Sequence, residues 1–93
     1  MLRSGVLYVG GHFNVAGPGC TPGHLAPCST RHHVAAFDTT NNTLLPWDPG
    51  ANSVHGLLVI ANGAPGVGFG GYFTRMGGIN QQGFSFYRTA RLP

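Results

Sequence analysis

The sequence predicts an all-β fold assembled from repeated antiparallel strands. Glycine supplies 16 and proline 7 of the 93 residues, which suits a chain with many tight turns. Lysine and glutamate are absent, and no run of ten residues combines helical spacing of apolar residues with freedom from Gly, Pro and β-branched residues. Because 42% of the residues are hydrophobic, the chain has enough apolar material for a core and is not expected to be disordered.

An internal repeat is the second basis for this prediction. The segment Gly10-Gly11-His12-Phe13 returns sixty positions later as Gly70-Gly71-Tyr72-Phe73. The run VAAF at 34–37 matches FSFY at 84–87 at an interval of fifty, so the first copy holds ten extra residues between its two runs. A repeat of this length predicts an array of supersecondary units. The recurring positions to which we assign a structural role are Gly10, Gly11, Phe13, Gly70, Gly71 and Phe73.

The first half of the chain is predicted to form three strands and one long loop. Residues 6–13 form the first strand, and the glycine pair inside it indicates a bulge or the close approach of a neighbouring strand. Residues 17–30 hold three prolines and three glycines and are expected to form the loop. Strands 33–38 and 43–47 follow, and Asn41-Asn42 is expected to close a two-residue hairpin between them because asparagine tolerates positive φ.

The second half is predicted to form three more strands and no helix. Asp48-Pro49-Gly50 marks the turn that precedes them. Residues 53–61 are the most apolar candidate and are expected to lie deep in a sheet, and Asn62-Gly63 is a second hairpin signal. Residues 67–74 carry the second glycine pair, and 83–88 form the last strand.

The order of the strands predicts how they are grouped. The repeat assigns the second, third and fourth strands of one unit to residues 1–50, with the Cys-containing loop at 17–30, and the first three strands of the next unit to 51–93. A complete unit is then a four-stranded antiparallel meander, and repeated four-stranded sheets build a β-propeller. The sequence therefore predicts a fragment of propeller blades, with a small β-sandwich or barrel as the alternative.

Four segments, in chain order, resemble one known repeat family. They are LYVGGHFNVAG at 7–17, HVAAFD at 33–38, TLLPWDP at 43–49 and SVHGL at 53–57. Together they are similar to the delta-sixty type repeat, a kelch-like β-propeller repeat of large bacterial surface and secreted proteins. The chain departs from that pattern at Asn42, where the family has glycine, and in its last strand, which lacks the family's Asp.

The resemblance implies about one and a half repeats that act as a non-catalytic structural or protein-interaction scaffold. It implies that Asp38 and Trp47 are structural positions of the repeat. Other blades of the same propeller, or further copies of the chain, are the implied partners, and the implied location is extracellular or on a cell surface. The ten-residue insert is optional in such repeats and has no family-wide role.

Cys20 and Cys28 are the only cysteines, and both lie in the insert. A disulfide that pins the loop is favoured, because a loop rich in proline and glycine has no other source of order. A zinc site would combine the cysteines with His32 and His33, but the spacing C-x7-C-x3-H-H does not match structural zinc sites. Two free thiols are the third interpretation. We expect no cofactor.

The sequence offers no set of catalytic residues, so we expect no enzyme activity. Asp38 and Asp48 are the only acids, and both lie beside turns, where aspartate ordinarily bonds a backbone N–H two residues on. Without glutamate the usual carboxylate pair of a glycosidase is missing, and the glycine run at 66–71 lacks the lysine and helix of a phosphate loop. The histidines therefore lack catalytic partners: His12, His24, His32, His33 and His55. A propeller enzyme with catalytic residues outside this chain is a further alternative.

Three aromatic residues are candidates for stacking against a ligand: Tyr8, Trp47 and Tyr72. Rings that face solvent would favour a carbohydrate-binding module, whereas rings packed between sheets would favour a scaffold. For Trp47 we expect the second, because aromatic rings dominate the packing between sheets.

Charge and hydropathy argue against two further classes. Five arginines and two acids give a net charge of +3, but the arginines are scattered, so nucleic-acid binding is not expected. No apolar run reaches the length of a membrane span, and no signal-peptide core follows Met1.

The predicted strand order leaves sheet edges unpaired. The first sheet is expected to lack its first strand and the second sheet its fourth, as in a piece of a longer repeat protein. Bare edges recruit other chains, so we expect the isolated chain to self-associate, to complete a ring from several copies or to unfold in part.

Overall fold

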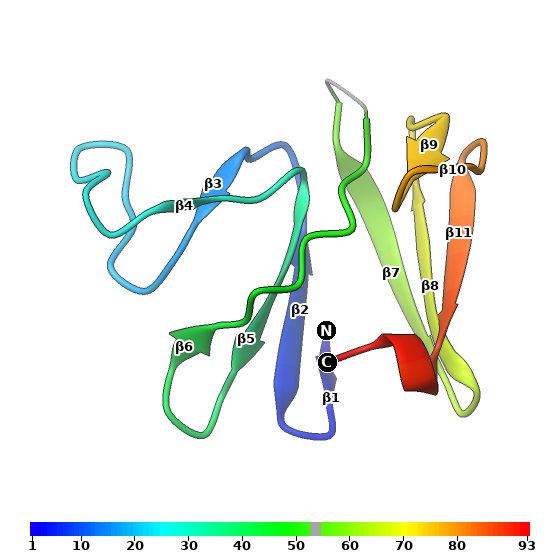
Figure 1. Ribbon diagram of the computed structural model, residues 1–93, viewed down its shortest axis with the longest axis horizontal. Coiled ribbons are helices and arrows are strands. Elements are labelled where there is room, and N and C mark those ends of the chain that lie inside the picture. The colour runs from blue at the N-terminus through cyan, green and yellow to red at the C-terminus, as the bar shows by residue number, and fades with distance from the viewer. Residues whose placement is uncertain (53–54) are drawn as a thin grey trace.

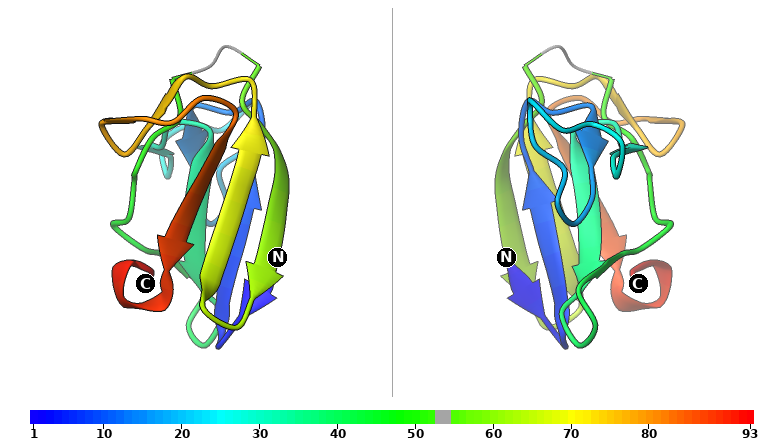
Figure 2. Two further views of the ribbon diagram at one scale, coloured as in Figure 1. Left: turned by 90° about the vertical axis from the view of Figure 1, so that its right-hand side faces the viewer. Right: turned by 90° about the vertical axis from the view of Figure 1, so that its left-hand side faces the viewer.

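Two antiparallel sheets that pack face to face make up most of the molecule. The computed structural model describes residues 1–52 and 55–93 (Figure 1). The second sheet faces the viewer from one side of the molecule and the first sheet from the other (Figure 2). The predicted all-β class is confirmed, because the regular structure of the described residues is strand apart from one turn of 3-10 helix, η1 (Thr89–Arg91).

The first sheet has the strand order β1-β2-β5-β6, with bounds β1 (Leu2–Arg3), β2 (Val6–Gly10), β5 (Val34–Asp38) and β6 (Thr43–Leu44). The central strands pair from Val6 opposite Asp38 to Gly10 opposite Val34. The predicted strand 43–47 is shorter than expected. Pro46, with its fixed φ, turns the chain away, and the Leu45 carbonyl accepts from the Arg31 guanidinium at 2.8 Å.

The second sheet has the strand order β11-β8-β7, with bounds β7 (Leu57–Gly63), β8 (Gly66–Gly71) and β11 (Phe84–Arg88). β8 is its central strand, and all five residues of β11 pair with it, from Phe84 opposite Gly70 to Arg88 opposite Gly66. A bulge between Leu57 and Val59 interrupts the pairing of β7 with β8.

The internal repeat is visible in the strands. β2 and β8 carry the glycine pairs, and β5 and β11 are their respective partners. Between the two long strands of each pair the chain forms a short hairpin: β3 (Val15–Ala16) with β4 (Ser29–Thr30), and β9 (Arg75–Met76) with β10 (Ile79–Asn80). The insert lies inside the first hairpin, where residues 17–28 occupy the place of Gly77-Gly78 in the second. These four short strands were not predicted, because two-residue pairings leave no periodic pattern.

The expectation that the first sheet lacks its first strand is wrong. β1 pairs with β2, with Leu2 opposite Leu7 and Arg3 opposite Val6, so the sheet has a short first strand. The Met1 amino group and carbonyl also bond the backbone of Tyr8, each at 2.7 Å. The second sheet has no fourth strand within the described residues, and β11 is its outer edge.

The strand predicted at 53–61 is also corrected. Its first two positions lie outside the described residues, and β7 begins at Leu57. β7 is an edge strand and does not lie deep in a sheet, since Leu58 and Val59 are 62% and 58% exposed. The bulge places both of these side chains on the outer side of the sheet. At the start of β7, Leu57 is the residue whose side chain is buried.

The two-residue turn predicted at Asn41-Asn42 and the hairpin predicted at Asn62-Gly63 both differ from expectation. Four residues, 39–42, separate β5 from β6, and Asn42 takes a positive φ of 55°. At the other site Gly63 and Gly66 are paired strand residues, so the turn residues are Ala64 and Pro65. Tertiary pairing, rather than the Asn-Gly signal, sets where each hairpin closes.

The core lies between the two sheets. Tyr8, Val34 and Ala36 face inward from the first sheet, and Val67, Phe69 and Tyr87 face them from the second; all six are buried. Arg3 ties the sheets together at their edge by donating to the Ala64 carbonyl and the Thr89 hydroxyl. The side chains that alternate with the core residues point to the two outer faces of the molecule.

Candidate functional site

A single tryptophan lies where the two sheets meet. Trp47 follows β6, and its half-buried ring makes an edge contact with Tyr8 of the first sheet, at a centroid distance of 5.6 Å. It contacts Phe69 and Tyr87 of the second sheet at 5.8 and 6.1 Å. Trp47 therefore acts as a wedge between the sheets, the placement expected from the sequence.

A cavity of about 680 Å³ opens beside this tryptophan. Its walls come from the β1–β2 turn, the end of β5 and the segment after η1. They include Val6, Asp38, Trp47, Arg91 and Leu92. The cavity thus combines an apolar lining with one carboxylate and one guanidinium, a composition that suits a small polar ligand with an apolar face.

The other two predicted stacking residues lie in opposite environments. Tyr8 is 1% exposed, so its ring cannot stack against a ligand, and that interpretation is wrong for this residue. Its hydroxyl donates to the Pro93 carbonyl at 3.4 Å. Burial raises the pKa of the Tyr8 phenol, and the positive charge of Arg3 opposes part of that effect.

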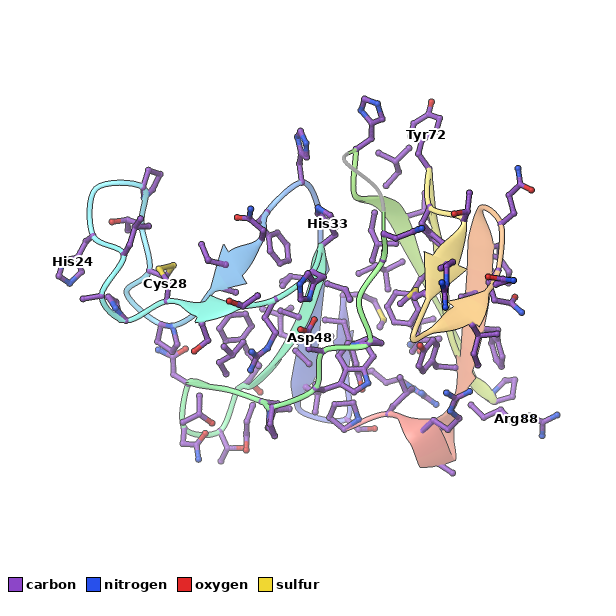
Figure 3. All side chains as sticks on the ribbon, turned by 45° about the horizontal axis from the view of Figure 1, so that its top comes forward. His24, Cys28, His33, Asp48, Tyr72 and Arg88 are labelled. Carbon is purple, nitrogen blue, oxygen red and sulfur yellow. A yellow bond between two sulfur atoms is a disulfide. The ribbon has the colours of Figure 1, made fainter. Side chains whose placement is uncertain are left out.

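Tyr72 is 69% exposed, and its side chain points outward at the top of the view in Figure 3. Its ring is 5.5 Å from that of His55, which in turn is 6.4 Å from His12. His12 and Tyr72 are equivalent positions of the repeat, so the two copies place one ring each on either side of His55. Of the three predicted stacking residues, Tyr72 is therefore exposed, Trp47 is half-buried and Tyr8 is buried.

The two aspartates form hydrogen bonds with backbone N–H groups, and one of them also contacts a histidine ring. Asp38 accepts from the Thr40 N–H at 2.9 Å, two residues on, as expected of an aspartate beside a turn. Asp48 instead reaches across to His32, where it accepts from the backbone N–H at 3.0 Å and contacts ring Nδ1 at 2.9 Å. His33 bonds the Ala51 carbonyl through its own Nδ1 at 2.8 Å.

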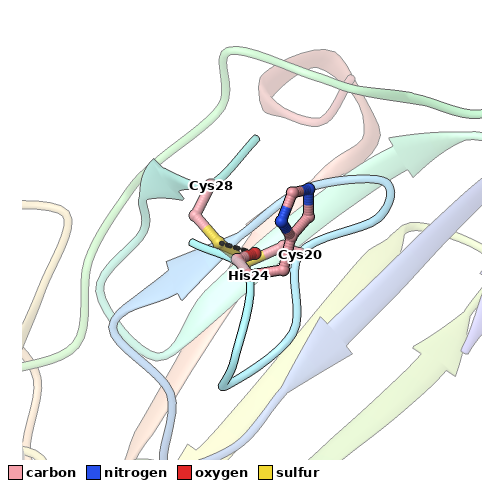
Figure 4. The surroundings of a disulfide bond; sticks show 3 residues. All are labelled: Cys20, His24 and Cys28. Atoms are coloured by element: carbon pink, nitrogen blue, oxygen red, sulfur yellow. Dashed lines mark hydrogen bonds between the residues drawn. A yellow bond between two sulfur atoms is a disulfide. The ribbon is translucent and has the colours of Figure 1, made fainter. Parts of the chain in front are cut away.

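Cys20 and Cys28 form a disulfide, as favoured from the sequence, with their Cα atoms 5.1 Å apart (Figure 4). The bond closes the loop inside the β3–β4 hairpin, away from the core. The carbonyl of His24, a residue of the same loop, lies 3.9 Å from the Cys28 sulfur, and the His24 backbone N–H donates to the Thr21 carbonyl at 2.9 Å. The zinc interpretation is excluded for these cysteines, because their sulfurs are bonded to each other.

The repeated glycines have unequal surroundings. A Cβ on Gly71 would lie 2.6 Å from the Gly56 carbonyl oxygen, and one on Gly10 would lie 3.0 Å from the Leu57 Cβ. At Gly11 and Gly70 the nearest atoms are 3.5 and 3.7 Å away, which is ordinary contact. The close approach expected for all four glycines therefore applies to one glycine of each pair. The adjacent aromatic residues are Phe73, which is 1% exposed, and Phe13, which is half-buried.

Two phenylalanines on the outer face of the second sheet were not predicted as a surface. Phe84 and Phe86 are 55% and 43% exposed. The alternation in FSFYR, with Ser85 and Tyr87 buried, was the signal that could have placed them on one outer face.

Within residues 1–52 and 55–93 no three metal-binding side chains of the His, Cys, Asp or Glu type lie together. In the same part of the chain, no helix is long and apolar enough to cross a membrane. Comparison of the sequence and structure with protein-family models, curated proteins and solved structures finds no match.

Proposed function

We propose that this chain is a non-catalytic β-propeller repeat segment that acts as a structural or protein-interaction scaffold outside the cell or on its surface. One observation carries the proposal: the two repeats stack with the same orientation. Tyr8, Val34 and Ala36 of the first repeat are buried against the second, while their counterparts Gly68, Phe84 and Phe86 lie on the opposite, outer side. A stack in which each unit uses one face toward each neighbour is what repeat proteins require.

The disulfide supports the proposed location, because such bonds persist in oxidising compartments. The single tryptophan supports the scaffold role, because its ring contacts side chains of both sheets.

Trp47 fluorescence tests this proposal, since the chain has no other tryptophan. We expect emission typical of a partly buried indole, one cooperative change on thermal or urea unfolding, and no change on titration with a panel of neutral, acidic and amino sugars. Hydrogen exchange should show that amides of β2, β5, β8 and β11 open together, because both sheets share one core. A sugar-dependent shift in emission, or separate opening of the two sheets, would contradict the scaffold proposal.

A second candidate function is carbohydrate binding in the cavity beside Trp47. The observation that favours it is the pairing of an indole with Asp38 and Arg91 in one lining of about 680 Å³. The same titration decides between the two candidates. Asp38→Asn provides the matched variant, because it keeps the shape of the side chain and should abolish a sugar-dependent shift only if the carboxylate binds the ligand.

A further inference from the structure

The outer face of the second sheet is an exposed apolar surface. Its members, which we call the outer phenylalanine face, are Leu58, Val59, Phe84 and Phe86, with exposed fractions between 43% and 62%. Gly68 lies between the strands that carry them, and a Cβ there would meet the Phe84 ring at 2.8 Å. The Phe84 ring thus occupies the space that a side chain at position 68 would fill.

The outer face of the first sheet carries a second apolar surface. Leu2, Leu7, Phe37 and Leu44 are paired directly across all four strands, from β1 to β6, and we call them the outer leucine row. Leu2 is 62% and Leu7 36% exposed, and the other two are half-buried. The two sheets face opposite sides of the molecule (Figure 2), so their outer faces point in opposite directions.

The repeat indicates what each surface fits. Leu7 and Phe37 correspond to Val67 and Tyr87, which are buried against the first sheet. Phe84 and Phe86 correspond to Val34 and Ala36, which are buried against the second sheet. The outer leucine row is therefore the repeat equivalent of one side of the internal sheet-to-sheet interface, and the outer phenylalanine face is the equivalent of the other side.

We propose that the outer phenylalanine face binds the outer leucine row of a second copy of this chain, so that copies stack head to tail. This proposal rests on the proposed scaffold function and names its partner. The intermolecular contact continues the interface that already joins the two repeats within one chain. Large exposed apolar patches mark such interaction surfaces.

The predicted contact is heterologous, because two different surfaces meet. A symmetric dimer would instead pair one surface with itself. Head-to-tail stacking leaves one surface free at each end, so association continues beyond two copies until a ring closes or the concentration limits growth. This difference makes the proposal testable with variants that block one surface each.

Sedimentation velocity over a range of concentrations, with circular dichroism to verify folding, is the first measurement. We expect the full disulfide-bonded chain to form species larger than a dimer as concentration rises. Leu7→Glu blocks the outer leucine row and Phe86→Glu blocks the outer phenylalanine face. Each variant should weaken association about tenfold or more, because a charge must be buried on an apolar face. Val59→Glu repeats the second block should Phe86→Glu fail to fold.

Leu25→Glu is the matched control, because Leu25 is 59% exposed in the disulfide loop and belongs to neither surface. It should associate like the unmodified chain. An equal loss of association in this control would overturn the proposal, since any added negative charge would then have the same effect.

Mixing the two blocked variants is the decisive step. Each retains one intact surface, so the mixture of Leu7→Glu and Phe86→Glu should form a dimer and nothing larger. Three outcomes overturn the inference: no association in the mixture, full association of Leu7→Glu alone, or an unmodified chain that is a folded monomer at every concentration. A folded monomer at every concentration would still be compatible with the scaffold proposal if Trp47 fluorescence shows that both sheets unfold together.

Discussion

The ring of Trp47, from the first repeat, lies 5.8 Å from the ring of Phe69 in the second, and this contact joins two parts of the chain that are separated by a turn and an edge strand. Phe69 is fully buried in β8, so the indole packs against the centre of the second sheet. The two repeats therefore share one core. Their stability should depend on side chains that belong to both.

We predict that Trp47→Ala lowers the free energy of unfolding by about 2–4 kcal/mol, because a large ring is removed from a well-packed but half-exposed position. Tyr72→Ala is the control, since that ring is 69% exposed and its loss should change stability by less than about 0.5 kcal/mol. Urea unfolding followed by circular dichroism measures both. Equal effects of the two substitutions would show that Trp47 is not a structural wedge.

The glycine pairs should respond unequally to the same substitution. Gly71→Ala places a Cβ 2.6 Å from the Gly56 carbonyl oxygen, and we expect a loss of more than about 1 kcal/mol. Gly11→Ala, with its nearest neighbour at 3.5 Å, should be neutral within about 0.5 kcal/mol or slightly stabilising. Melting temperatures of the two variants decide this. A Gly11→Ala variant as unstable as Gly71→Ala contradicts the geometry.

Reduction of the Cys20–Cys28 disulfide should lower the melting temperature without unfolding the sheets. The cross-link closes a loop of nine residues, counting both cysteines, which constrains the unfolded chain by at most about 2–3 kcal/mol. The loop lies outside the core, so circular dichroism at room temperature should keep its strand signal. Cys20→Ala/Cys28→Ala is the control and should melt at one temperature with and without reductant. Complete unfolding on reduction would mean that the loop supports the core.

Stability should fall at alkaline pH. Burial raises the pKa of Tyr8 and Tyr87 above the ordinary 10.0, and the nearby Arg3 and Arg91 oppose part of the shift. The unfolded chain ionises its phenols first, so this contribution is fully present below about pH 10 and is lost as pH rises through the raised pKa values.

Urea unfolding at several pH values between about 8 and 11 measures this effect. Tyr8→Phe keeps the buried ring but removes one phenol, so its stability should decline less steeply above about pH 10. A decline identical to that of the unmodified chain would mean that Tyr8 ionises as easily when folded as when unfolded.

Local sequence patterns were sufficient to predict several of the long strands. The matched runs that predicted strands at 33–38 and 83–88 correspond to β5 and β11, because residues two apart share a face and the pattern needs no knowledge of distant contacts. The disulfide was also predictable, since the only two cysteines lie in one short loop.

The remaining features depend on residues that are far apart in the chain. The pairing of Leu2–Arg3 with β2, and the length of β6, follow from contacts that no local pattern encodes. The crowding of Gly71 rather than Gly70 arises because Gly56 and Leu57 approach β8 from its edge strand. Exposure of the most apolar segment, β7, was likewise decided by its place at the edge of a three-stranded sheet.

The amino-acid sequence was enough to predict the class of the fold, the repeat and most of the long strands, and to favour the disulfide, because each depends on residue type and short-range spacing. Only the tertiary structure decided which faces are buried, that Tyr8 is enclosed while Tyr72 is exposed, and that Phe84 and Phe86 form an outer face. The physical reason is that burial belongs to the packing of one sheet on another. Two equivalent positions of a repeat can therefore have the same backbone and opposite surroundings.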